Sequence, residues 1–402
     1  MSATDPLKQS TFSVTAGGYS ARCVAPDDVA HRLCSLLVDL VTPDPVAAGR
    51  IEVDHAPDGC YIIRSDGRLW NDTVPEADLP DQVVRMLLWA ALDAESTLVH
   101  IHAGSVTLQE RTLVLAGWPA SGKSTAIAAL VSSGFSYVTD ERLVLSSDGL
   151  SVAGFPKPIS LIAGSFDVFP DLDPERTGRG ASNGTTWQIP ASSVGPVAPL
   201  GFRAPSVLVF IDYRQGAPLR VSTVAPVEAA ARLLGDSPDV VARGYEGANA
   251  IVSLVVSTPS VEVEYSATDE LVPALRDLLK RSAPITTVES IGLKGIAVSD
   301  DPAPGSPAAI DTARSFAITD AASVWIIDDR ALAYLHRSGH VVELDEANAA
   351  WLQLLDPERS IDELIGEIAG ETETDADAVR SAARQAVYSL WGAGVIGPTT
   401  GT

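Results

Sequence analysis

The chain has 402 residues, of which 46% are hydrophobic and 20% charged, and its formal net charge is −24. This length favours two or three domains over a single compact core, and the composition is that of a globular protein. The acidity argues against nucleic acid and anionic membranes as main partners, and it favours a basic peptide wherever the acidic residues cluster.

The sequence predicts a cytoplasmic protein that does not contact membranes. Its three cysteines, Cys23, Cys34 and Cys60, have no metal-binding spacing and leave one unpaired in any disulfide scheme, which favours a reducing compartment. No apolar run reaches the ~18 residues that a membrane span requires. The N-terminal stretch MSATDPLKQS contains no apolar signal segment.

Residues 1–95 are expected to form a small α/β subdomain in which no chemistry is recognisable. Residues 61–64 have the character of a strand, and residues 31–40 and 82–92 that of helices. Residues 96–285 are rich in strands with helices at intervals, including a strand at 206–213 and helices at 226–234 and 270–279. The sequence therefore predicts a second α/β domain over this range.

Residues 117–125, GWPASGKST, match the phosphate-binding pattern G-x-x-x-x-G-K-[ST]. The preceding RTLVLA, residues 111–116, is an apolar run typical of a buried strand, and residues 124–133 are typical of a helix, with Gly134 at its C-cap. Strand, glycine loop and helix together direct backbone N–H groups toward anionic oxygens. The alternative is a glycine-rich turn with a surface lysine, but the chain has only five lysines in total.

We therefore expect a P-loop that binds ATP and Mg²⁺. The residues assigned to the nucleotide are Gly117, Ala120, Ser121, Gly122, Lys123, Ser124 and Thr125. Lys123 would reach the β- and γ-phosphates, and the hydroxyl of Ser124 would bind Mg²⁺.

An acidic pair, Asp140 and Glu141, follows the P-loop at the end of a predicted strand in FSYVTDERLVL. In P-loop proteins, a carboxylate at the end of a neighbouring strand holds Mg²⁺ through water or takes a proton from the nucleophile. Adjacent residues of a strand face opposite ways, so Asp140 is expected to be the metal-binding and catalytic carboxylate. For Glu141, a catalytic role and a solvated strand end remain equally open.

Two histidines, His100 and His102, share one face of the strand predicted in LVHIHAGSV. They could ligate a metal, but no third ligand of suitable spacing is visible, and a packed structural pair is the alternative. His102 is the candidate catalytic residue, because an imidazole near a transferring phosphoryl group can donate a hydrogen bond or relay a proton.

Two further stretches carry basic residues whose roles stay open. In GFPKPISL, residues 154–161, two prolines hold Lys157 in an extended segment, where it either contacts phosphate or peptide or lies at the surface of a stiff turn. RTGRGASNGTTW, residues 176–187, is either a mobile lid carrying Arg176 and Arg179 or a plain loop.

Residues 286–315 are predicted to form a linker, because SDDPAPGSPAAIDTAR is rich in proline, alanine and aspartate and has no periodicity. Residues 316–402 form the next predicted domain. Strands are expected at 323–327, 331–336 and 341–344, followed by a helix capped by Asp345, a helix opened by the capping box of Ser360 and Glu363, and a helix at 376–393. This order predicts a winged-helix-like domain.

A winged helix that binds DNA is the alternative interpretation of residues 316–402, although this domain has few Lys and Arg.

HAGSV, GWPASGKST and GFSYVTDERLVL, taken in this order, resemble the catalytic half of the HPr kinase/phosphorylase family over about residues 96–280. The resemblance implies an ATP-binding fold related to phosphoenolpyruvate carboxykinase and phosphoryl transfer to a serine hydroxyl of a peptide or protein, with Asp140 as base. It also implies a homo-oligomer. The family's second aspartate is replaced by Glu141, and its downstream signature is absent.

Residues 316–402 resemble the PqqD-like family, the recognition element of ribosomally made and modified peptides (RiPPs), in VVELDEANAAWLQLLD, RSIDELIGEIA and the last helix. The resemblance implies that a precursor's leader peptide binds by strand addition between an edge strand and the last helix. The residues expected to bind it are Val324, Ile326, Leu332, Val379, Ala383, Val387 and Leu390.

Together these features predict a RiPP biosynthesis protein that binds a leader peptide and uses ATP and Mg²⁺ to phosphorylate a Ser or Thr of the precursor. The alternative is a nucleotide-binding scaffold, weakly active or inactive, that presents the precursor to another modifying enzyme. The change to Glu141 favours the scaffold, and the intact P-loop favours the kinase.

Overall fold

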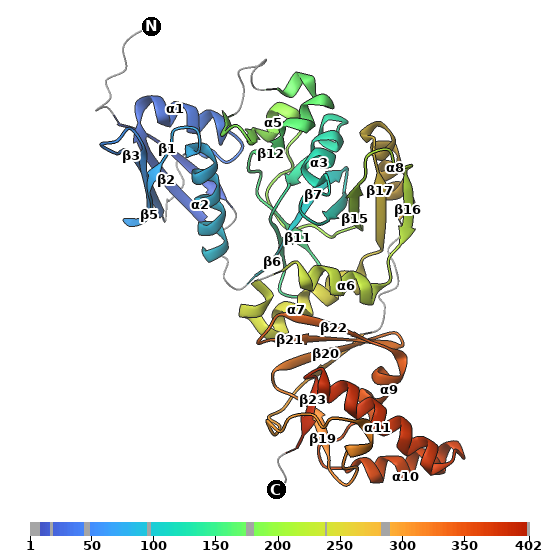
Figure 1. Ribbon diagram of the computed structural model, residues 1–402. Helices are drawn as coiled ribbons and strands as arrows, with labels where there is room; N and C mark the ends of the chain where they lie inside the picture. The colour runs from blue at the N-terminus through green and yellow to red at the C-terminus, as the bar shows by residue number, and fades with distance from the viewer. Residues whose placement is uncertain are drawn as a thin grey trace. The chain divides into compact units, whose positions relative to one another are not determined.

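The computed structural model of the protein has a mixed α/β fold, as the sequence predicts (Figure 1). The structure describes residues 9–16, 19–43, 49–94, 98–173, 181–237, 239–282 and 290–399. The chain divides into two compact units, each assembled from separate stretches. The first unit draws on residues 1–146, 150–223 and 261–283, and the second on residues 147–149, 224–260 and 284–402.

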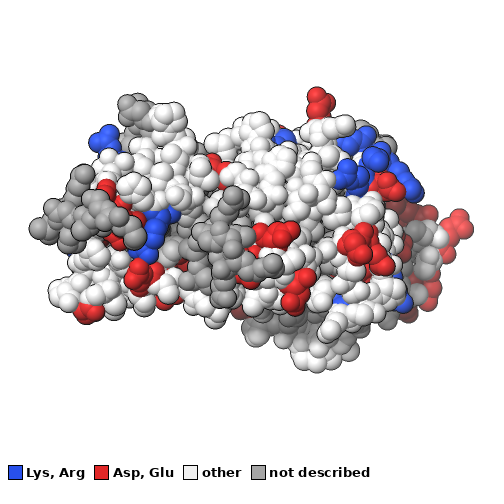
Figure 2. Space-filling view, turned by 90° about the horizontal axis from the view of Figure 1, so that it is seen from above, with Lys and Arg blue, Asp and Glu red and all other residues white. Residues whose placement is uncertain are grey.

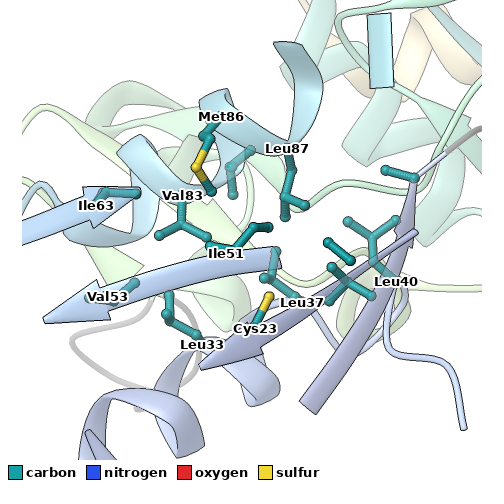
Figure 3. Close-up of a cluster of buried hydrophobic side chains, with 14 of the residues drawn as sticks. Cys23, Leu33, Leu37, Leu40, Ile51, Val53, Ile63, Val83, Met86 and Leu87 are labelled. Carbon is teal, nitrogen blue, oxygen red and sulfur yellow. The ribbon is translucent and has the colours of Figure 1, made fainter. Parts of the chain in front are cut away.

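The N-terminal part of the first unit is a five-stranded sheet that packs against two helices. The strands lie in the order β1-β2-β3-β4-β5, with β2 and β3 parallel and the other pairs antiparallel. The elements are β1 (Gln9–Ala16), β2 (Tyr19–Pro26), α1 (Asp27–Leu36), β3 (Gly49–His55), β4 (Tyr61–Ser65), β5 (Arg68–Val74) and α2 (Leu79–Ala94). Leu33 of α1, Val83 of α2 and Ile51 of β3 meet in the core (Figure 3). Val144 and Phe155 join this core, so it is continuous with the part of the unit that follows.

The centre of the first unit is a six-stranded sheet in the order β16-β17-β15-β8-β7-β9. Its strands and packed helices are β7 (Ala103–Leu108), β8 (Arg111–Ala116), α3 (Lys123–Ser132), β9 (Ser136–Thr139), β15 (Val207–Tyr213), β16 (Arg220–Thr223), β17 (Ser260–Tyr265) and α8 (Thr268–Arg281). Buried side chains of α3 and α8 form one core with these strands. The predicted strand at 111–116 is β8, and the predicted helix is α3, which Gly134 follows with a φ of +92°. The strand–loop–helix unit is therefore confirmed.

Two three-stranded sheets complete the first unit, in the orders β11-β10-β6 and β12-β14-β13. Their elements, with the short helices nearby, are β6 (Val99–Ile101), β10 (Leu143–Leu145), β11 (Val152–Ala153), β12 (Ile159–Ile162), the 3₁₀ turns Ala163–Asp167 and Pro170–Leu172, β13 (Ala181–Ser182), β14 (Thr186–Ile189) and α5 (Ala191–Val194). β12 matters for the site, because it packs against α3.

The second unit is a four-stranded antiparallel sheet, β18-β20-β21-β22, between two sets of helices. Its elements are α6 (Pro226–Gly235), α7 (Asp239–Ser257), β18 (Ser290–Lys294), β19 (Phe316–Ile318), β20 (Ala322–Ile327), β21 (Arg330–Leu335), β22 (His340–Leu344), α9 (Glu346–Leu354), α10 (Ile361–Thr372), α11 (Ala376–Gly392) and β23 (Ile396–Pro398). One face of the sheet shares a core with α9, α10 and α11. α6 packs on β21 and β22, and α7 on β18 and β20.

Trp325 joins α7 to the second face of this sheet. Its indole ring stacks on Tyr245 with ring centroids 5.5 Å apart, and its Nε1–H donates to Oδ1 of Asn249 at 3.0 Å. Such ring stacking is worth about 0.5–1.5 kcal/mol beyond the area that the two rings bury. α7 is therefore an integral part of the second unit, although the chain enters it between β16 and β17 of the first.

The helix starts of the second unit follow the sequence closely. The side chain of Asp345 accepts a hydrogen bond from the backbone N–H of Asn348 at the start of α9. Ser360 and Glu363 form the predicted capping box of α10. The stretch expected to be a linker contains β18, which pairs with β20, and a 3₁₀ turn at Pro307–Ala309.

Charged side chains are spread over the face that Figure 2 shows. On the face that Figure 2 shows, acidic side chains form several separate groups and basic side chains gather in a few places. The chain has a net charge of −24, and on that face its acidic side chains do not form a single patch. Within the described ranges, every helix is too short or too polar to span a bilayer.

Candidate functional site

The P-loop, residues 117–125, has a backbone that only glycine tolerates at two positions. A Cβ atom on Gly117 would lie 2.5 Å from Oγ of Ser121 and 2.7 Å from the carbonyl oxygen of Ile211. Gly122 has a φ of +81° and a Cβ there would lie 2.4 Å from the hydroxyl of Tyr265. That hydroxyl donates a hydrogen bond to the carbonyl of Gly122 at 3.1 Å. The turn is therefore compact and held from outside by β15 and β17.

Polar groups of the P-loop fit a phosphate chain. Lys123 is buried, and its ammonium donates to the carbonyl of Gly117 at 2.9 Å, so the side chain folds back over the loop. The Oγ atom of Ser121 is buried and makes no hydrogen bond within the described part of the chain, which leaves it available for an anionic oxygen. The backbone N–H groups at the start of α3 add a partial positive charge.

The P-loop and the acidic pair lie at the same edge of the central sheet. β8 runs into the P-loop, and β7 pairs antiparallel to it, with Ala103 opposite Ala116. β9 pairs antiparallel to β7, with Ser105 opposite Thr139. β8 and β9 therefore point the same way, and Asp140, which follows β9, lies beyond the same edge as the P-loop.

Two contacts connect the first turn of α3 with the region of Asp140. The hydroxyl of Thr125 lies 2.9 Å from that of Ser165, which follows β12. The backbone N–H of Ser160, within β12, donates to Oδ2 of Asp140 at 3.1 Å. Gly104 separates Asp140 from α3, because a Cβ there would lie 3.3 Å from the Cα of Asp140 and 3.0 Å from Ile127.

Asp140 is a buried carboxylate that already has partners at both oxygens. Its Oδ1 lies 2.7 Å from the ammonium of Lys157 and accepts a hydrogen bond from the hydroxyl of Tyr137 at 3.0 Å. Its Oδ2 accepts the N–H of Ser160. Burial and the neighbouring Asp140 charge raise the pKa of the Tyr137 hydroxyl well above its usual value, so this group is a hydrogen-bond donor.

Lys157 is fully buried and lies between Asp140 and Glu141, which excludes the surface position that the sequence left open. Burial alone would lower the pKa of Lys157, but the two carboxylates raise it above its usual value. Lys157 in turn lowers the pKa of Glu141, against the opposing effect of burial, and His102 adds to the decrease. Asp140, Lys157 and Glu141 thus form one group of contacts beyond the end of β9.

The two histidines differ in environment. His100 lies on β6, opposite Val144 of β10, and is buried. His102 follows β6 and is partly exposed. Its charge lowers the pKa of Glu141. Among the described residues, no three His, Cys, Asp or Glu side chains gather as a metal-binding group. The expected lid residues Arg176 and Arg179 lie outside the described residues.

Several residues that shape this site have no recognisable signal in the sequence. Tyr265 supports Gly122, Ser165 contacts Thr125, and Ser160 binds Asp140. All three lie far from the P-loop in sequence, and a tyrosine at the end of a strand, a serine within a strand or a serine in a 3₁₀ turn carries no distinguishing pattern. The pairing of Lys157 with Asp140 has a partial signal, since two prolines around a single lysine indicate a fixed position.

The seven residues expected to bind a peptide do not form an exposed surface, so this prediction is corrected. The seven residues named for it are all buried, and six of them belong to the core between the sheet and the C-terminal helices: Val324, Ile326, Val379, Ala383, Val387 and Leu390. Leu332, the seventh, is buried outside that cluster. β20 and β21 each have a strand on both sides, because β18 covers β20, so neither is an edge strand.

Within the described part of the chain, β18 and β22 are the outer strands of this sheet, and β22 is the one beside the end of α11. Val342 and Leu344 lie opposite Ala333 and Ala331 of β21. The backbone N–H and C=O groups of an antiparallel strand alternate between facing the partner strand and facing away, so alternate residues of β22 direct these groups away from β21. A pocket of about 600 Å³ adjoins this edge, between β22, the start of α9 and the end of α11.

The pocket beside β22 is mainly acidic. Its charged lining residues are Asp329, Arg330, Glu343, Asp345 and Glu346, and Ser389 and Ala393 of the α11 end also line it. Arg330 is paired with Glu343 at 2.8 Å. The remaining carboxylates leave the pocket with a negative charge.

No protein-family model matches the chain, and no curated protein matches it. Among solved structures, the Hpr(Ser) kinase/phosphatase from Coxiella burnetii is similar over 45% of this chain and 93% of its own, with 11% sequence identity and a TM-score of 0.23. The functional conclusions therefore rest on the residues of the site.

Proposed function

We propose that the protein is a RiPP biosynthesis enzyme that binds ATP with Mg²⁺ and transfers the γ-phosphoryl group to a Ser or Thr hydroxyl of a precursor peptide. The observation that carries this proposal is the P-loop itself, with two obligatory glycines, the buried hydroxyl of Ser121 and Lys123 at the start of α3. An HPr-kinase-like domain is the fold we propose for residues 96–285.

In this reaction the hydroxyl oxygen of the acceptor forms a bond to the γ-phosphorus while the bond to the bridging oxygen breaks, and ADP leaves. The hydroxyl proton passes to a carboxylate of the Asp140–Glu141 region. Lys123 would leave the carbonyl of Gly117 to contact phosphate oxygens, and Ser124 would hold the Mg²⁺ that neutralises their charge. Most of the rate enhancement would come from positioning and charge neutralisation.

We further propose that the leader of the precursor adds as a strand to β22 and lies in the adjoining pocket, as in PqqD-like recognition elements. Strand addition suits β22 because it is an edge strand beside α11. The carboxylates of the pocket favour a leader with Lys or Arg at this position. Binding at one unit would raise the local concentration of an acceptor tethered to it to about millimolar.

The test is incubation of the full chain with ATP, Mg²⁺ and the precursor peptide encoded beside its gene. Mass spectrometry should detect one added phosphoryl group, and tandem fragmentation should place it on a Ser or Thr. Tight peptide binding without any added phosphoryl group would contradict the kinase assignment.

A second function, a nucleotide-binding scaffold that presents the precursor to another modifying enzyme, is favoured by one observation. Asp140, the carboxylate expected to be the base, is engaged by Lys157, Tyr137 and Ser160. The same mass measurement separates the two functions, because the scaffold binds both nucleotide and peptide and leaves the peptide unchanged.

A further inference from the structure

Lys157 has the surroundings of a bound cation. Its Nζ lies 2.7 Å from Oδ1 of Asp140, 3.0 Å from the carbonyl of Pro158, 3.1 Å from Oγ of Ser160 and 3.4 Å from Oε2 of Glu141. These are four oxygen atoms around a single positive charge, whereas an ammonium has three N–H donors. Oxygen shells that include two carboxylates are also what hard divalent cations require.

The segment that carries Lys157 has little freedom to withdraw it. Pro156 and Pro158 flank the lysine, fix their own φ angles and restrict the residues before them. Both prolines and the lysine are buried, and the backbone N–H of Lys157 donates to the carbonyl of Phe155 at 2.8 Å. The position of the ammonium is therefore set by the fold.

The two carboxylates contacted by Lys157 differ in what they leave accessible. The side chain of Asp140 is 1% exposed, and Lys157, Tyr137 and Ser160 contact its two oxygens. The side chain of Glu141 is 40% exposed and shares one oxygen with Lys157. Of the pair, only Glu141 has a carboxylate that a ligand can approach without displacing a buried ion pair.

We infer that Lys157 stands where a divalent cation would otherwise lie between Asp140 and Glu141, and that it is a positioning residue for the pair. Asp140 then neither binds Mg²⁺ nor accepts the proton, and Glu141 is the carboxylate that faces the nucleotide. This inference rests on the proposed phosphoryl transfer. It reverses the roles that the sequence suggested for the two acids.

The test measures Mn²⁺ binding, a spectroscopic substitute for Mg²⁺, by the loss of the free-ion signal in electron paramagnetic resonance. The full chain is titrated with and without a non-hydrolysable ATP analogue, as wild type and as Lys157→Met, Asp140→Asn and Glu141→Gln. Circular dichroism establishes that each variant is folded. Lys157→Met keeps an unbranched side chain of similar length and removes the ammonium, with its charge and its hydrogen bonds to Pro158 and Ser160.

Without nucleotide, Lys157→Met should bind Mn²⁺ at least about tenfold more tightly than wild type, because two carboxylates then lack their counter-ion. An unchanged affinity in a folded variant would overturn the inference. This measurement needs no nucleotide, so it decides the role of Lys157 even if wild type fails to bind ATP, a failure that would count against the proposed function.

With nucleotide, Glu141→Gln should weaken Mn²⁺ binding at least about tenfold, as loss of a group at a metal site does, whereas Asp140→Asn should leave it within about threefold of wild type. The opposite order, with Asp140→Asn the weaker binder, would also overturn the inference. This comparison decides it should Lys157→Met not fold.

Discussion

The hydroxyl of Tyr265, at the end of β17, donates a hydrogen bond to the carbonyl of Gly122, the N-cap residue of α3. Tyr265→Phe removes this bond and keeps the ring, so the P-loop should lose support worth about 1 kcal/mol. We expect up to about tenfold weaker binding of an ATP analogue by calorimetry. Tyr213→Phe, which keeps the edge-to-face ring contact with Tyr265, is the control. Equal affinities for wild type and Tyr265→Phe would show that the bond does not shape the nucleotide site.

Replacing Lys123 by alanine should separate the two proposed binding activities. The buried ammonium is the cation of the P-loop, so Lys123→Ala should reduce nucleotide affinity by at least about a hundredfold, since charged hydrogen bonds to phosphate are among the strong ones. Peptide affinity, measured by fluorescence anisotropy, should be unchanged. Lys280→Ala is the matched control, because this lysine is exposed on α8. Parallel loss of both affinities would argue against independent sites.

A proline in β22 should block the proposed leader site. Val341 is partly exposed on the edge strand, opposite Tyr334 of β21. Val341→Pro removes one backbone N–H and disfavours an added strand. We expect peptide binding to fall at least about tenfold, as the loss of one or two backbone hydrogen bonds predicts. Val341→Ala keeps the N–H and should bind almost normally. Full affinity of the proline variant would place the peptide elsewhere.

The bond between Trp325 and Asn249 should contribute measurably to the stability of the second unit. Trp325→Phe leaves the oxygen of Asn249 without its buried donor, which costs about 1–3 kcal/mol in the free energy of unfolding. Removing both partners, as Trp325→Phe with Asn249→Leu, should recover part of that loss. Urea unfolding of the full chain measures both. A double variant no more stable than Trp325→Phe alone would contradict this coupling.

One histidine gives the second unit a pH-dependent stability. Burial lowers the pKa of His336 below its usual value of 6.5, and its Nε2 lies 2.8 Å from Oγ of Ser323. The unfolded chain therefore takes up a proton at a higher pH than the folded chain does, and stability falls as the pH drops below about 6.5. His336→Gln should lose less stability between about pH 7.5 and about pH 5.5. The exposed His31→Gln should behave as wild type in the same urea titrations.

Local patterns were sufficient to predict much of the fold. The P-loop, its strand and its helix depend on residues within about twenty positions of one another, as do the caps at Asp345 and Ser360, and the structure contains them. Glycine at positive φ, short apolar runs and capping side chains act over a few residues. Such features can be read from one sequence.

Long-range pairing could not be predicted. β18 is unremarkable in sequence and becomes a strand because it pairs with β20, so that β20 is an inner strand and β18 and β22 are the outer strands of the sheet. The short apolar runs of β20 and β21 indicated strands, but not which neighbours would cover them. Likewise, the partner of Lys157 lies seventeen positions away, and only the fold brings Asp140 to it.

The interleaved path of the chain, with α6 and α7 entered between β16 and β17, restricts how this protein can exchange parts with others during evolution. A recombination event that transferred residues 316–402 alone would carry the C-terminal helices without β18 and without the two helices that pack on the other face of the sheet. The bared apolar face and strand edge would promote aggregation. A gene segment that encodes the whole second unit must therefore include α6 and α7, which precede β17, and the elements from β18 onward, which follow it. A single crossover that transfers this unit would also carry β17 of the first unit.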